Sequence, residues 1–198
     1  MLNKYLLTGI LSTLFLVMFF LQINCASQKD KPITKAEMIK RGAYLVNFGG
    51  CNECHTPKVF TDMGPVPDTT RLLSGHKQGS ILPIVDTSVV GHGKWYLSNV
   101  DLTAWVGPWG VSFAANLTPD EKTGLGSWTE EMFINSMRNG LHLGAGRPIL
   151  PPMPYMGLGS LSDEDLKSVF VYLQSISPVS NRIPDSVPPN EVAARYGK

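Results

Sequence analysis

The chain has 198 residues, and its 17 basic and 16 acidic side chains leave a formal net charge of +1. This length fits one domain with room for an insertion. The balanced charge provides no basic patch for nucleic acid, so we expect no nucleic-acid partner. Internal repeats and glycine-rich phosphate loops are absent from the sequence.

Residues 1–25 have the pattern of a signal peptide or a membrane anchor. Lys4 precedes an almost wholly apolar run from Leu6 to Leu21, and small residues follow, as in secretory signals. The run is shorter than the about 20 residues that a spanning helix prefers, which favours a cleaved signal. Cys25 lies where this segment ends, and its context resembles a bacterial lipobox only loosely. Lipidation of Cys25 and ordinary cleavage near Ala26 therefore stand as alternatives.

The first helix is predicted from Lys35 to about Phe48. Thr34 and Glu37 have the spacing of a capping box, and apolar and small residues then recur at helical intervals. Gly49 and Gly50 are expected to end the helix. Gly42, in its middle, is small enough to let a second helix approach closely.

The central motif is Cys51-Asn52-Glu53-Cys54-His55. Two thiols at this spacing can each form a thioether to a vinyl group on a porphyrin edge, and the next imidazole can then bind the iron. The alternatives are a thioredoxin-like redox pair and half of a zinc site. Zinc needs four ligands, and the one further cysteine is Cys25; a redox pair would follow a strand, whereas a predicted helix precedes Cys51. We expect one covalent haem c on Cys51 and Cys54, with His55 as an axial iron ligand.

Residues 58–115 are predicted to be a long, loop-rich region because several prolines suppress regular structure. The carbonyl of Pro67 is a candidate acceptor for the second ring N–H of His55, which would fix the tautomer. Short apolar runs at 81–85 and 94–97 indicate either small strands or ordered loop. Three neighbouring aromatic residues are expected to pack this region onto the domain rather than to shield a haem edge: Trp105, Trp109 and Phe113.

Two further helices are predicted in the second half of the chain. Ser127 and Glu130 suggest a capping box for a helix over about 129–138. Ser162 caps a second helix with a broad apolar face, which Pro178 ends. The segment between these helices is proline-rich and has no helical periodicity.

Together these features resemble the class I cytochrome c fold. They are more similar to single-haem c-type domains of bacterial periplasmic and membrane-associated cytochromes, which include cytochrome subunits that accept electrons from dehydrogenases. The resemblance implies a mainly α fold, with helices around one covalent haem and a loop-rich insertion. It also implies that the first and last helices cross at Gly42 or Ala43, opposite Tyr172. Four stretches carry the resemblance: 41–57, 115–120, 146–155 and 161–173.

The resemblance implies that a methionine before the last helix is the sixth iron ligand. Met153 is favoured because Pro152 and Pro154 brace it on both sides. Met156 is the alternative, and Met63 ranks last. Three histidines are expected to be structural or on the surface rather than distal ligands: His76, His92 and His142.

The expected domain organisation follows from these assignments. A tether over 26–33 connects the N-terminal segment 1–25 to a cytochrome c domain over 34–178. The loop insertion occupies about 58–115. The proline-rich tail 179–198 is expected to lie extended on the surface or to be loose.

Electron transfer is the expected function. Iron with two protein ligands has no open site for a substrate, and methionine raises the potential relative to a second histidine. We expect an exported, periplasmic, membrane-associated carrier or the cytochrome subunit of a respiratory oxidoreductase, with redox partner proteins. The alternatives are a haem enzyme, peroxidase-like or sulfur-oxidising, and a gas sensor whose distal ligand dissociates.

Overall fold

The computed structural model describes residues 32–197, so the predicted signal segment, Cys25 and most of the tether lie outside the described residues. The chain divides into one unit that ends at Thr34 and another from Lys35 to Lys198. All the described helices and strands belong to the second unit. None of the helices within residues 32–197 is long and apolar enough to cross a membrane.

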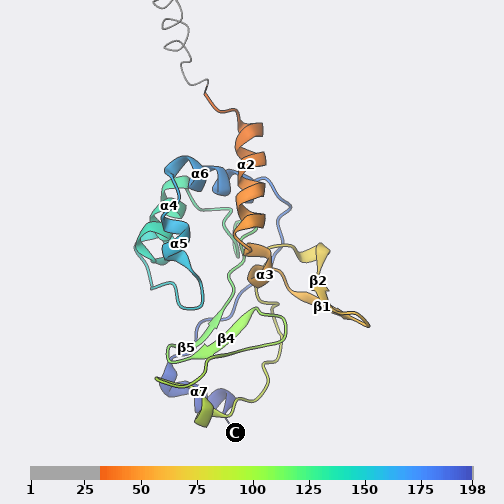
Figure 1. Ribbon diagram of the computed structural model, residues 1–198, viewed down its shortest axis with the longest axis vertical. Helices are drawn as coiled ribbons and strands as arrows, with labels where there is room; N and C mark the ends of the chain where they lie inside the picture. Colours follow the sequence, from red (N-terminus) through yellow and green to blue (C-terminus); the bar gives the residue numbers. More distant parts are fainter. Residues whose placement is uncertain (1–31, 198) are drawn as a thin grey trace, which may run out of the picture. The chain divides into compact units, whose positions relative to one another are not determined.

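In the described part of the chain, α2 and α3 come first, the short strands follow, and the other α-helices come after the last strand (Figure 1). The α-helices are α2 (Lys35–Phe48), α3 (Cys51–His55), α4 (Glu130–Asn139), α5 (Tyr155–Gly159), α6 (Asp163–Leu173) and α7 (Pro189–Tyr196). The strands are β1 (Lys58–Thr61), β2 (Gly64–Pro67), β3 (Leu97–Ser98), β4 (Ala104–Gly107) and β5 (Gly110–Phe113). Single 3₁₀ turns are η1 (Thr69–Arg71), η2 (Thr87–Val89) and η3 (His142–Gly144).

The larger hydrophobic core lies among α2, α4 and α6. The apolar faces that the sequence predicted supply most of it, and the rings of Phe133 and Phe170 meet with their centroids 5.5 Å apart. Each helix contributes side chains at helical spacing, so burial of these faces stabilises the packing. The buried members are Leu45, Val46, Leu73, Leu125, Phe133, Met137, Leu166, Val169, Phe170 and Leu173.

α2 and α6 cross at Gly42. A Cβ atom added there would overlap the carbonyl oxygen of Ser168 and lie 2.7 Å from the Cβ of Tyr172. Arg41 joins the same two helices through an ion pair with Asp165, with 2.8 Å between Nε and Oδ1. The predicted crossing opposite Tyr172 is confirmed, at Gly42.

Replacing Gly42 by alanine should lower the free energy of unfolding by about 1–3 kcal/mol, because the added methyl overpacks the crossing of α2 and α6. Gly157 in α5 is a matched control, since a Cβ there meets nothing within 4 Å. Gly157→Ala should leave stability unchanged or raise it through better helix propensity. Denaturant unfolding of the three proteins measures both effects. Equal stability of Gly42→Ala and the unmodified protein would contradict the close crossing.

The helix starts agree in part with the predicted caps. The Ser162 hydroxyl accepts a hydrogen bond from the Asp165 N–H at the start of α6, as predicted. At α4 the cap is Thr129, whose hydroxyl accepts from the Met132 N–H, so the assignment of Ser127 as the cap was wrong. α6 ends at Leu173, before Pro178.

The insertion is more regular than its prolines suggested. β1 and β2 form an antiparallel hairpin directly after α3. A two-stranded hairpin has only edge strands, where proline is tolerated because no inner neighbour needs its N–H. Further along, β3, β4 and β5 form a three-stranded antiparallel sheet.

The tail is neither loose nor extended throughout, because it is bonded to β5 and ends in α7, which corrects that expectation. Val187 exchanges two backbone hydrogen bonds with Val111 of β5, at 2.8 and 3.0 Å. α7 then packs against β5, as Figure 1 shows. Val187 and Val192 of the tail complete a second hydrophobic cluster with Val106 and Val111 of the insertion. Insertion and tail bury apolar side chains that neither could bury alone.

Candidate functional site

The short helix α3 presents the two cysteines and the histidine of the central motif. Gly50, in the left-handed conformation with φ of 66°, turns the chain from α2 into α3. Cys51 and Cys54 are partly exposed and form no disulfide within the described residues. Burial raises the pKa of both thiols, whereas reactive redox cysteines have a lowered thiol pKa.

His55 is buried, with 7% of its surface exposed. Its Nδ1 lies 2.7 Å from the carbonyl oxygen of Ala115. A carbonyl can only accept, so Nδ1 carries the proton and Nε2 carries the lone pair. Within residues 32–197, Nε2 has no hydrogen-bond partner. Burial lowers the pKa of His55, against the opposing effect of the Ala115 carbonyl, and keeps the ring in the neutral form that binds metals.

The expectation that Pro67 accepts this hydrogen bond was wrong. Pro67 is paired with Lys58 across the β1–β2 hairpin. Ala115 reaches the ring because residues 73–76 hold the segment that contains it: the His76 N–H donates to Ala114, and the Leu117 N–H donates to Leu73. A backbone acceptor leaves no side-chain signal in the sequence.

Lys58 is a site residue that the sequence reasoning missed. Its ammonium donates to the carbonyls of Glu53 at 2.9 Å and Thr56 at 2.8 Å, with Asn52 at 3.4 Å. These carbonyls end α3, where the helix dipole favours a positive charge. The detectable signal was a lysine just beyond the motif, in the position of a helix C-terminal partner.

Met153 and Met156 differ in their surroundings. Met153 is partly buried and packs against the larger core, as Cys51 does. Met156 is 76% exposed and Met63 is 95% exposed. The environment of Met153 therefore matches an inward-facing ligand better than that of the other two.

The other histidines have structural or surface positions, as expected. His76 is buried, and its Nδ1 lies 2.9 Å from the Thr103 hydroxyl. The ring of His142 meets Trp128 edge to face. His92 is exposed.

His76 should make the folded state sensitive to mild acid. Burial lowers the pKa of His76, although Asp101 opposes the shift. At pH values below the ordinary histidine pKa of about 6.5, the unfolded chain therefore binds a proton at residue 76 more readily than the folded chain does. The neutral, buried His76 side chain therefore contributes fully to the free energy of unfolding above a pH of about 6.5. This contribution is lost as the pH falls through the pKa of His76 in the folded state. Denaturant unfolding of His76→Gln and of the unmodified protein between about pH 6.5 and pH 5 should show a smaller loss in the variant. Parallel pH profiles would contradict this role.

The donor set and its surroundings fit a c-type haem. Two thiols, a neutral imidazole with a free Nε2 and an inward-facing thioether are the groups that such a haem requires. Partly buried apolar side chains from α3, residues 117–128 and residues 149–161 pack on the same core. They are Cys51, Leu117, Trp128, Ile149, Met153, Leu158 and Leu161.

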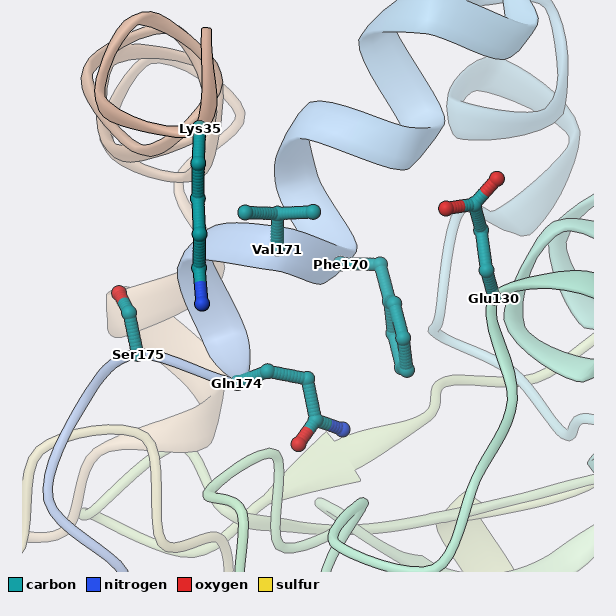
Figure 2. Close-up of a pocket in the computed structure, with 6 residues that line it drawn as sticks. All are labelled: Lys35, Glu130, Phe170, Val171, Gln174 and Ser175. Atoms are coloured by element: carbon teal, nitrogen blue, oxygen red, sulfur yellow. The ribbon is translucent and has the colours of Figure 1, made fainter.

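Two small cavities lie away from these residues. The cavity in Figure 2 has a volume of about 190 Å³, and Lys35 points into it between Ser175 and Gln174. A second one, of about 120 Å³, lies between the insertion and Tyr196 of α7. Neither is lined by a cysteine, histidine or methionine of the candidate site.

Comparisons with known proteins give relatives but no family model that matches the chain. The cytochrome c subunit of the quinone alcohol dehydrogenase of Gluconobacter oxydans is 26% identical over 151 residues, which are 75% of this chain and 24% of that protein. The gluconate 2-dehydrogenase cytochrome c subunit of Pantoea cypripedii is 26% identical over 160 residues, 80% of this chain and 28% of that protein. The fructose dehydrogenase cytochrome subunit of Gluconobacter japonicus is 34% identical over 142 residues, 71% of this chain and 22% of that protein.

The chain thus spans less than a third of the length of each of these relatives. Haem c is the cofactor that cytochrome c subunits imply. The matches, together with the thiol, imidazole and thioether groups above, identify the chain as a cytochrome c domain protein related to the cytochrome subunits of dehydrogenases.

Proposed function

We propose that this chain transfers electrons through a single haem c. Thioethers from Cys51 and Cys54 would hold the haem, and His55 and Met153 would be the ligands of its iron. The domain over 34–178 would be a class I cytochrome c fold, in which α2 and α6 cross beside the motif. The geometry of His55 carries the proposal, because its ring follows the two thiols and the Ala115 carbonyl leaves Nε2 available for a metal.

The surroundings of these ligands favour electron transfer over chemistry on a substrate. Bound haem iron gains and loses one electron, and its axial ligands tune the potential. The chain's residues would keep both axial positions filled: burial holds His55 in place, and the core positions Met153. A protein of this kind needs only a docking surface, and redox encounters often use small interfaces.

The relatives suggest the kind of partner. They are named as cytochrome subunits of dehydrogenases, so we propose that a dehydrogenase donates electrons to this chain.

We also propose export to the periplasm, with membrane attachment through residues 1–25 or a lipid on Cys25. Cell fractionation of Cys25→Ala tests the lipid. If a lipid on Cys25 attaches the unmodified protein to the membrane, the cleaved form of the variant should leave the membrane fraction. An unchanged distribution of the mature protein would contradict lipidation.

Absorption spectra test the proposed function. The oxidised protein should show the weak long-wavelength band of iron–sulfur ligation. Carbon monoxide should leave the spectrum of the reduced protein unchanged, because Met153 occupies the position that the gas would take. Ready binding of carbon monoxide at neutral pH would favour a haem enzyme or a gas sensor instead.

A further inference from the structure

The β4–β5 hairpin of the insertion reaches the loop that carries Met153. The hydroxyl of Ser112, in β5, donates a hydrogen bond of 2.6 Å to the carbonyl oxygen of Pro151. The indole Nε1 of Trp109 donates to the same hydroxyl at 3.1 Å. Ser112 is buried, with 6% of its surface exposed. Since the hydroxyl has a single proton, the indole donor leaves that proton for Pro151.

The indole that orients Ser112 is itself held in place. The ring of Trp109 packs against Tyr96, with 5.8 Å between ring centroids. It also lies over Gly107, where an added Cβ would come within 2.6 Å of the ring. The turn between β4 and β5 therefore accommodates the indole only because residue 107 has no side chain.

The hydrogen bond from Ser112 ties down a loop with few other anchors. Residues 150–154 otherwise bond to near neighbours: the Met153 N–H lies 3.4 Å from the Leu150 carbonyl, and the Tyr155 N–H lies 2.9 Å from that of Met153. Within the described residues, Ser112 supplies the one hydrogen bond that this loop receives from a distant part of the chain. Pro151 lies two residues before Met153, so its position bears directly on where the thioether lies.

We propose that Ser112 and Trp109 are positioning residues for the sixth ligand, which hold Met153 at the iron by fixing the carbonyl of Pro151. This inference rests on the proposed function, because it assumes that Met153 is a ligand. It gives the insertion a role beyond packing: the hairpin stabilises the weaker of the two axial bonds. A thioether ligand is easily displaced from iron. The hydrogen bond from the buried Ser112 to Pro151 makes displacement of Met153 harder because it fixes the loop.

Competition with added imidazole tests the proposal. Titrating the oxidised proteins with imidazole and following the loss of the long-wavelength band measures how easily Met153 is displaced. In Ser112→Ala, the apparent affinity for imidazole should rise about fivefold, which corresponds to the about 1 kcal/mol of one hydrogen bond. Ser112→Thr keeps the hydroxyl and should restore the original affinity. Trp109→Phe keeps a ring but loses the donor, and should change the affinity in the same direction by a smaller factor.

Ser168→Ala is the matched control. Ser168 is also buried, and its hydroxyl bonds to the Glu164 carbonyl at 2.7 Å within α6. This variant should lose stability without a change in imidazole affinity. An unchanged affinity in Ser112→Ala, an equal rise in Ser168→Ala, or a threonine variant as labile as the alanine variant would overturn the proposal. If the unmodified protein lacks the band, methionine ligation itself fails; if only the variants fail to differ, the proposed function stands and this inference falls.

Discussion

Replacing both Cys51 and Cys54 by alanine should give a protein that loses its haem on denaturation, whereas the unmodified protein should retain it. Thioethers are covalent, so unfolding cannot release a haem that they hold. Without them, only the axial ligands and apolar contacts hold the haem, and these are lost when the chain unfolds. Haem staining after denaturing electrophoresis measures the difference directly.

Single variants and Cys25→Ala serve as controls for this result. Cys51→Ala and Cys54→Ala should each retain haem through the remaining thioether, in lower yield. Cys25 lies outside the motif, so Cys25→Ala should stain as strongly as the unmodified protein. Equal retention of haem by the double variant would show that the attachment lies elsewhere.

Met153→Ala should abolish the long-wavelength band of the oxidised protein and allow carbon monoxide to bind the reduced protein. The variant removes the thioether but leaves His55 and its bond to Ala115 intact. The reduction potential should also fall, because a methionine ligand raises it. Absorption spectra and a redox titration of the purified variant measure these changes.

Met156→Ala is the natural comparison, since Met156 is mostly exposed and lies three residues away. Its spectrum and potential should match those of the unmodified protein. Survival of the band in Met153→Ala, with its loss in Met156→Ala, would move the ligand to Met156 and require the loop to rearrange.

Local patterns predicted the three longest helices, α2, α4 and α6, but not α5 or α7. The bounds of α2 agree with the prediction because apolar periodicity and Gly49–Gly50 define them within a single stretch of chain. The cap of α6 at Ser162 is similarly local. At α4, Ser127 and Thr129 are both suitable caps, and the structure uses the one next to the helix.

Apart from the crossing of α2 and α6, which the resemblance implied, contacts between distant parts of the chain could not be predicted. The Ala115 carbonyl reaches His55 across 60 positions, and a carbonyl looks the same at every residue. α7 is stabilised by Val106 and Val111, which belong to β4 and β5, two strands that the sequence did not indicate. The contact of Ser112 with Pro151 likewise joins two segments that each looked irregular.

The intact mass of the mature protein shows whether a haem is covalently attached to Cys51 and Cys54. The protein should be purified from cells able to attach c-type haem, then treated with an alkylating reagent after unfolding. We expect the mass of the mature chain plus one haem, with Cys51 and Cys54 both resistant to alkylation. A colourless protein of unmodified mass, in which both thiols are alkylated, would contradict this expectation.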